Sequence, residues 1–280
     1  METIIAYFET IPSLHRSILL VGGLSFFWIL EGTFFLFPFR YKKWKHALPN
    51  LFFTLTTVLI NFILAFLLLN TSDWVQDNQF GILHWIPSVP LWAEVLIGVL
   101  FLDLIGAYAP HWVEHKIKPL WMIHLVHHSD HHVDTTTANR HHPLESIIRF
   151  VFTLFGVFLV GAPIGIVMLY QSLSLIATQF THANIKLPKK VDHFMSFVLV
   201  SPDMHKTHHH YRLPYTDSNY GNIFSLWDRL FGTYLPFDRE KLVYGVDVFF
   251  DEEANGKIGT LLKQPLQTYS KPTLTPKKEL

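Results

Sequence analysis

The chain has 280 residues, half of them hydrophobic, with 22 basic residues, 22 acidic residues and 18 histidines. The balanced charge gives no basis for nucleic-acid binding. The absence of cysteine excludes thiolate-ligated iron–sulfur clusters, cysteine-based zinc sites and disulfides.

Three apolar runs in the N-terminal part have the length of membrane-spanning helices. They extend from Ile18 to Phe37, from Leu51 to Leu69 and from Leu91 to Tyr108. Each is close to the ~20 residues that cross ~30 Å of hydrocarbon. A buried helix of a large soluble protein could mimic one such run, but three in succession favour a multi-pass integral membrane protein.

The loops between these runs indicate their orientation. Basic residues crowd the end of the first run, at Arg40, Lys42, Lys43 and Lys45. Residues 70–90 carry Asp73 and Asp77 and neither Lys nor Arg. By the positive-inside rule the basic loop is cytoplasmic, and the third run returns the chain to the cytoplasmic face before His111.

A fourth apolar region, residues 150–181, has no charged residue in 32 positions. As one helix it would extend ~48 Å, too long for one crossing. Its centre reads GAPIG at 161–165, which favours a break. We therefore predict a helical hairpin, which also returns His182 to the side of His111. The fold class is an all-α membrane bundle of three spanning helices plus this Pro/Gly-broken hairpin, with a cytoplasmic histidine-rich di-metal cap.

Fifteen of the 18 histidines fall between His111 and His210, and eight of them recur at helical spacing. Residues three and four apart share a helix face, and imidazole suits iron, zinc or copper. Eight imidazoles exceed what one tetrahedral zinc needs, so the pattern favours two metals over a solvated histidine-rich surface. The three groups are His111 and His115; His124, His127 and His128; and His205, His208 and His209.

These segments read HWVEH at 111–115, HLVHHS at 124–129 and HKTHH at 205–209. Together with RHHPLE at 140–145, THAN at 181–184, NYG at 219–221 and WDRLFGT at 227–233, they resemble the fatty acid hydroxylase/sterol desaturase superfamily. The resemblance covers residues 91–236. One departure is Trp112, where the family commonly has Arg.

The resemblance implies a non-haem di-iron centre with two Fe ions, which uses O2 as co-substrate to hydroxylate or desaturate a lipid from the bilayer. It also implies an electron-donor protein, such as a cytochrome b5-like or ferredoxin-like carrier. Carried over residue by residue, it gives the eight histidines above as metal ligands. It adds His182, which stands where the family often supplies a further histidine.

The remaining histidines are weaker candidates. For His142 the sequence favours equally a role at the metal site and a structural role beside Pro143. His131 and His132 are not counted as ligands, and the other six are predicted to lie at the surface, beside the ligands or away from the site: His15, His46, His84, His141, His193 and His210.

Four other polar residues stand out. Asp103, late in an apolar helix, either hydrogen-bonds the free nitrogen of a ligand histidine or lies at the membrane interface. Glu31 is predicted to pair with the nearby basic loop. Asn219 and Asp228 are interpreted as scaffold or as neighbours of the ligands.

We predict three regions: N-terminal transmembrane helices (1–110), a catalytic histidine-rich region (111–236) that includes the membrane hairpin, and a C-terminal cytoplasmic segment (237–280) whose end is a loose tail from Leu262. The expected location is a bacterial inner membrane or the endoplasmic reticulum, where Lys277 and Lys278 would act as a retrieval signal.

Two other functions stay open, a histidine-rich metal-binding or transport protein and a zinc-dependent, O2-independent lipid hydrolase or isomerase. Metal identity and O2 dependence separate all three. The lipid is equally open among a sterol, a fatty acyl or sphingoid chain, an ether lipid and an isoprenoid.

Overall fold

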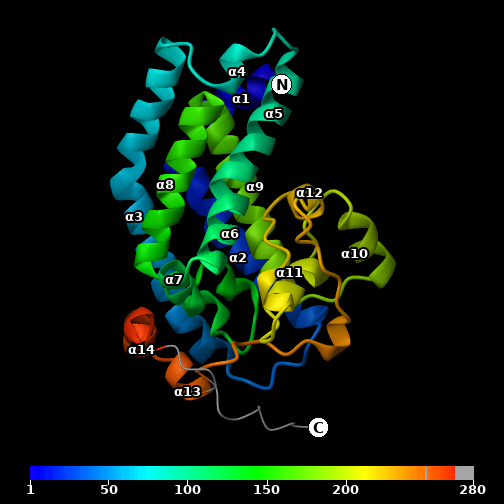
Figure 1. The fold of residues 1–280 in the computed structure, drawn as a ribbon. Helices are drawn as coiled ribbons and strands as arrows, with labels where there is room; N and C mark the ends of the chain where they lie inside the picture. The colour runs from blue at the N-terminus through cyan, green and yellow to red at the C-terminus, as the bar shows by residue number, and fades with distance from the viewer. Residues whose placement is uncertain (250, 269–280) are drawn as a thin grey trace.

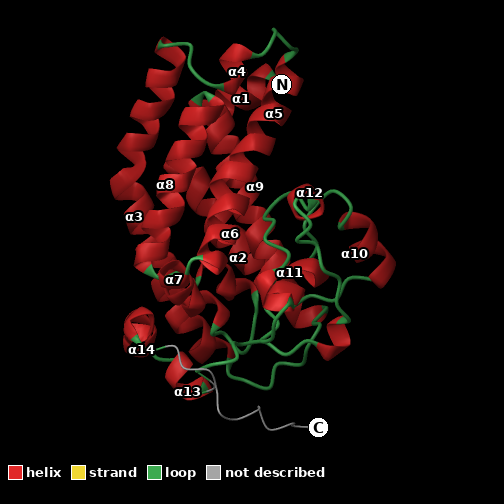
Figure 2. Cartoon of the chain, viewed as in Figure 1, coloured by secondary structure: helices red, strands yellow, loops and turns green. Residues whose placement is uncertain are grey.

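A computed structural model describes residues 1–249 and 251–268 as a bundle of long helices, with short helices and loops gathered towards one end (Figure 1). Extended pairing within these residues is limited to isolated bridges, and Figure 2 shows helices and loops alone. The helices are α1 (Glu2–Glu9), α2 (Ser13–Thr33), α3 (Lys43–Asp77), α4 (Ile82–Trp85), α5 (Leu91–Asp103), α6 (Ala109–Lys116), α7 (Lys118–His128), α8 (Pro143–Val160), α9 (Ile164–His182), α10 (Lys189–Met195), α11 (Pro202–His208), α12 (Leu226–Leu230), α13 (Glu252–Asn255) and α14 (Ile258–Lys263). The short turns are η1 (Leu104–Tyr108), η2 (Thr135–Asn139), η3 (Tyr215–Asp217), η4 (Arg239–Lys241) and η5 (Gln264–Leu266).

Five helical segments are long and apolar enough to cross a membrane. Large apolar side chains stand outward on them, as at Phe62, which is 79% exposed. Such surfaces are stable in hydrocarbon rather than in water, so the expectation of an all-helical membrane protein is confirmed. The segments are Ser13–Thr33, Lys43–Trp85, Leu91–Lys116, Pro143–Val160 and Ile164–His182.

The first membrane-length helix ends earlier than predicted. The apolar run was expected to continue to Phe37, but α2 ends at Thr33. The backbone of the following residues bonds to a distant segment instead, with Leu36 N–H donating to Asn184 O at 3.0 Å and Lys186 N–H donating to Phe34 O at 2.7 Å. This pairing joins the end of α2 to the end of α9.

The third apolar run bends before the first histidines. After α5 the chain makes the π-helical turn η1, in which Ala109 N–H donates to Leu104 O, and then continues as α6. Pro110 lies in the first turn of α6. Because proline has no N–H and its ring displaces the carbonyl four residues earlier, the wider turn is a natural consequence. It sets the direction of α6, which carries His111 and His115.

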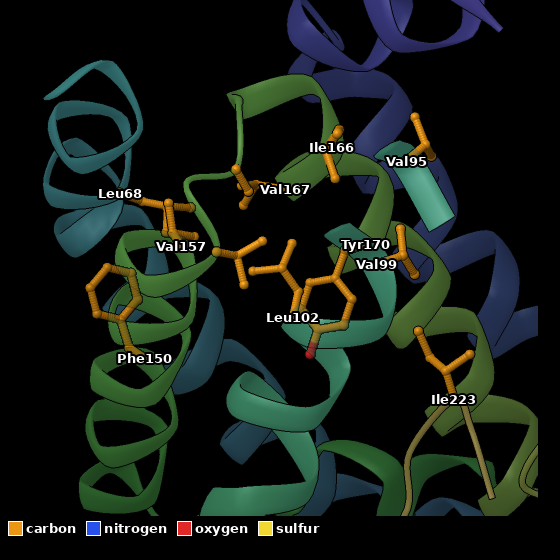
Figure 3. Packing of buried hydrophobic residues seen from close by; sticks show 12 residues of the cluster. Leu68, Val95, Val99, Leu102, Phe150, Val157, Ile166, Val167, Tyr170 and Ile223 are labelled. Carbon is orange, nitrogen blue, oxygen red and sulfur yellow. The ribbon is translucent and has the colours of Figure 1, made fainter. Parts of the chain in front are cut away.

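The predicted break in the fourth apolar region is present. Helix α8 ends at Val160 and is capped by Gly161, whose φ is +71°, and α9 begins at Ile164. A Cβ at Gly161 would lie 2.3 Å from Phe80 O, so a side chain does not fit there. The two helices do not form a simple hairpin, because α5 packs against both of them. Figure 3 shows Leu102, Val157 and Tyr170, one from each helix, meeting in the shared core.

The C-terminal segment is more ordered than predicted. The expected loose tail from Leu262 is wrong for its first residues, because Leu262 lies in α14 and η5 continues to Leu266. Leu261 is fully buried and packs with Phe53 and Val126. Lys277 and Lys278 lie outside the described residues.

Candidate metal centre

The structure brings together all nine histidines that the sequence singled out. They form two groups, and within each group one ring nitrogen per residue lies within 4.8 Å of the others. The first group, of five, combines α6, α7 and α11: His111, His115, His124, His128 and His208. The second group, of four, combines α7, the end of α9 and α11 with the residue after it: His127, His182, His205 and His209.

Helical spacing explains how α7 and α11 each contribute to both groups. His124 and His128 lie one turn apart and face the first group, whereas His127 points into the second. In the α11 segment, His208 joins the first group, and His205 and His209 join the second. The groups adjoin, since the rings of His128 and His209 stack with centroids 4.8 Å apart.

Hydrogen bonds fix the protonation of three rings. Nδ1 of His111 lies 2.8 Å from Tyr220 O, Nδ1 of His182 lies 2.8 Å from Thr178 O, and Nδ1 of His208 lies 2.6 Å from Ser218 O. A carbonyl oxygen only accepts, so each Nδ1 carries the proton and each Nε2 presents a lone pair. This is how metal-ligating imidazoles are usually oriented.

The Nε2 atoms have no adequate partner within the protein. Nε2 of His111, His115 and His208 is buried without a hydrogen bond in the described structure. In the second group, Nε2 of His182 lies 3.0 Å from Nε2 of His205 and 3.2 Å from Nε2 of His209. Converging lone pairs repel one another unless a proton or a cation lies between them. The donor set therefore fits bound metal ions, and all-imidazole ligation suits iron, zinc or copper.

Electrostatics keeps these rings neutral. Burial lowers the pKa of His208 to about 3. Burial, followed by the neighbouring imidazoles, lowers the pKa of His127 and His128 well below the usual value. Neutral imidazole is the form that binds a metal.

His124 differs from the other ligand candidates because its partner is a carboxylate. Its Nδ1 lies 2.7 Å from Glu145 Oε1. Arg149 binds the same carboxylate through Nε at 3.0 Å and Glu114 Oε2 through Nη2 at 2.7 Å. Glu114 and Glu145 are buried, and with Arg149 between them they form an ion-pair network rather than a third cation site. This network was not predicted from the sequence, and its only local signal is the four-residue spacing of Glu145 and Arg149.

Asp103 does not contact a ligand histidine, and it is not at an interface. The carboxylate is fully buried and accepts hydrogen bonds from Ile223 N–H and Phe224 N–H, both at 3.2 Å, and from Trp227 Nε1 at 3.0 Å. Both predicted roles were wrong. Asp103 instead holds the loop that precedes α12 against α5.

His46 lies outside both histidine groups, as predicted, but it has a structural role that the sequence did not indicate. Its Nε2 lies 2.8 Å from Asp130 Oδ1 and its Nδ1 lies 3.0 Å from Asp134 Oδ2. Both carboxylates are buried, and Asp130 comes two residues after the candidate ligand His128. Nothing local in the sequence joins residue 46 to residue 130, so this contact depends on how α3 packs against the loop after α7.

The other residues follow the sequence expectations more closely. His142 has the structural role, because its Nδ1 accepts Leu144 N–H at the start of α8. Glu31 pairs with Lys43 at 2.8 Å. Asn219 and Asp228 are scaffold, and Asp228 accepts the backbone N–H groups of Tyr220 and Gly221.

The remaining histidines stay outside both groups. The ring of His141 lies 4.9 Å from that of His127, and His132 pairs with Glu252 at 2.7 Å.

Comparison with known proteins agrees with this arrangement. Residues 95–233 match the fatty acid hydroxylase family. This part of the chain belongs to the family. The match begins in α5 and ends just after α12, so it contains all nine clustered histidines. No solved structure matches the chain significantly.

Three relatives differ in the kind of lipid that their names give. The chain is 24% identical over 150 residues to the ornithine lipid hydroxylase OlsE of Rhizobium tropici, covering 54% of this chain and 44% of the relative. It is 29% identical over 180 residues to alkylglycerol monooxygenase of Danio rerio, covering 64% and 38%. It is 26% identical over 232 residues to methylsterol monooxygenase 2-2 of Arabidopsis thaliana, covering 81% and 85%. The matched part thus spans less than half of the first two relatives.

Proposed function

We propose that this fatty acid hydroxylase family member is a membrane-bound di-iron monooxygenase that hydroxylates a C–H bond of a lipid. The observation that carries the proposal is the pair of adjoining, buried imidazole groups beside apolar helices of membrane-spanning length. The names of the three relatives, all lipid hydroxylases or monooxygenases, support hydroxylation rather than desaturation.

In this proposal each histidine group holds one iron ion, through the nine residues named above. Two irons bound there would supply the activation of O2. The balanced reaction converts a C–H bond and O2, with two electrons and two protons, into an alcohol and water. The electrons come from a separate donor protein of the cytochrome b5-like or ferredoxin-like type, and we propose that the centre faces the cytoplasm.

The chain itself orients and insulates the centre. Carbonyl groups of Tyr220, Thr178 and Ser218 hold three imidazoles with Nε2 inward. Burial of the ring cluster excludes water, which favours reaction with an apolar C–H group over loss of oxidising equivalents to solvent. The second-group residue His182 ends α9, so a lipid approaching along the membrane helices reaches the centre without crossing bulk water.

The proposal is tested by metal analysis of the detergent-purified full chain with one ligand removed from each group. We expect about two irons per parent chain and loss of iron in His127→Ala and in His208→Ala. His15→Ala, altered at an exposed residue of α2, serves as the matched control and should retain parental iron. If all three variants bound as much iron as the parent chain, the assignment of His127 and His208 as ligands would be contradicted.

The reaction is tested next by lipid mass spectrometry of expressing cells with and without oxygen. A lipid that gains one oxygen atom only in air, and only with the parent chain, supports the monooxygenase. Bound zinc under iron-replete conditions, with activity independent of O2, would favour a hydrolase or isomerase. Metal transport would be favoured by metal uptake without any lipid change.

A further inference from the structure

Besides the membrane-length helices, the region of short helices has an apolar surface of its own, where a region in water would be polar. Helix α10, the turn at 196–199 and helix α12 with its following residue expose large apolar side chains. We name this surface the α10–α12 patch, formed by Phe194, Val198, Leu199, Leu226, Leu230 and Phe231. Phe194 is 80% exposed and Leu230 is 65% exposed. Contiguous apolar surface of this kind usually marks an interaction site.

The polarity of α10 is inverted relative to a helix that covers a protein core in water. Asp192 is buried and accepts hydrogen bonds from Ser201 Oγ at 2.6 Å and from Asp203 N–H at 3.1 Å. Val191 and Phe194, three residues apart and therefore on one face, are exposed. The polar side of α10 is satisfied inside the protein, so its apolar side needs apolar surroundings.

The patch is built into the fold and is not a loose loop. Val198 O accepts Ser225 N–H at 3.1 Å, and Leu199 forms an isolated bridge with Phe224. Arg229 donates through Nη2 to Ser196 O at 2.7 Å. These bonds join the turn after α10 to α12, and they hold the exposed side chains in one continuous surface.

The place of the patch relative to the bundle indicates what covers it. Figure 1 shows α10 beside the lower half of the bundle and α12 level with the middle of α8 and α9, whereas α13 and α14 lie at the lower end of the bundle. Helices α8 and α9 are candidate membrane spans. The patch is therefore at the same level as surfaces that contact lipid.

Charge at the edge of the patch fits a membrane surface. Lys189 and Lys190 are exposed at the start of α10, and Lys189 also pairs with the exposed Glu240 at 3.1 Å. Basic residues beside an apolar helix face are typical of helices that lie in the lipid interface, where they meet anionic headgroups. Arg229, whose guanidinium lies 5.1 Å from the ring of Phe197, adds a third basic group at this edge.

We propose that the α10–α12 patch inserts into the headgroup–acyl boundary of the lipid bilayer and holds the short-helix region against the membrane. Helix α11 and the residue after it supply three of the clustered histidines. The start of α11 is joined to α10 by the hydrogen bond from Ser201 to Asp192. Insertion of the patch thereby fixes the depth of the candidate metal centre. This proposal does not depend on which metal binds or which reaction follows.

The absence of cysteine allows a direct measurement of depth. Single-cysteine variants Phe194→Cys and Leu230→Cys of the full chain are spin-labelled and reconstituted in vesicles of phosphatidylcholine and phosphatidylglycerol. Collision of the label with O2, which concentrates in lipid, is compared with collision with a water-soluble nickel chelate. Leu266→Cys is the matched control. Leu266 is also apolar and is 87% exposed, but it lies outside the α10–α12 patch, in the turn η5 that follows α14.

We expect O2 accessibility to exceed chelate accessibility several-fold at 194 and 230, and the ratio to reverse at 266. Two results would overturn the proposal. Chelate accessibility at 194 and 230 equal to that at 266 would place the patch in water. Low accessibility to both reagents would mean that a second copy of the chain or another protein covers it. Unchanged unfolding curves of the labelled variants show that the label has not disrupted the fold.

Discussion

Glu145 should control metal affinity through His124 without binding the metal. Replacing it with Ala removes the acceptor 2.7 Å from His124 Nδ1, and both side chains are fully buried. A hydrogen bond to a charged group contributes about 1.5–3 kcal/mol, equivalent to roughly a tenfold to hundredfold change in binding. In other metal sites, removing a carboxylate that hydrogen-bonds a ligand histidine lowers the metal affinity by a similar factor, about 10–100-fold. We therefore expect the apparent affinity for Fe(II) to fall by about one to two orders of magnitude in Glu145→Ala.

The assay is anaerobic competition for Fe(II) between the purified chain and a coloured chelator. Glu145→Gln keeps an amide oxygen that can accept from His124, so it should recover part of the affinity. Glu253→Ala is the control, because that carboxylate is 83% exposed and pairs only with Lys257 among the contacts in the described structure. Parental affinity in a folded Glu145→Ala variant would refute the positioning role.

Three further predictions concern stability. His46→Ala leaves Asp130 and Asp134 buried without their shared partner, which should cost about 3–5 kcal/mol in unfolding titrations, whereas His15→Ala should cost little. Asp103→Ala leaves three N–H donors without an acceptor and should cost about 3 kcal/mol or more; unfolding free energy within 1 kcal/mol of the parent would contradict this estimate. Burial lowers the pKa of His210 to about 4, so protons bind the unfolded chain first as the pH falls below the ordinary value of about 6.5. The contribution of His210 to stability should therefore be full above pH 6.5 and decline towards pH 4 by up to about 1.4 kcal/mol per pH unit for this one group. His210→Gln should reduce the slope of stability against pH by that amount; equal slopes would show that His210 does not contribute.

The sequence predicted the helices well where the signal is local. Apolar length marked the five membrane-length segments, and the residues at 161–163 marked the break between α8 and α9. It was less accurate at the ends of elements. The extension of α2 to Phe37 failed because Phe34 and Leu36 pair with residues 184–186, and no apolar run can show a partner so distant in sequence.

The candidate site shows the same division. Helical spacing selected eight of the nine histidines that the fold gathers into two groups, because residues three or four apart share a helix face whatever the helix packs against. His182 has no such neighbour and was added only by the family resemblance. Spacing could not show that α7 and α11 each serve both groups, since this depends on the angle at which the two helices meet.

The roles of the buried charges were decided by tertiary structure. A buried carboxylate must find a partner, but the sequence does not say which. Asp103 was expected either near a ligand histidine or at the membrane interface, and instead binds the loop before α12. His46 joins Asp130 across 84 positions. The sequence by itself determined that the protein is a membrane helix bundle with a histidine cluster, because apolar length and helical periodicity are local properties. Only the folded chain decided the partners of Glu114 and Asp130, because Arg149 and His46 lie far from them along the chain.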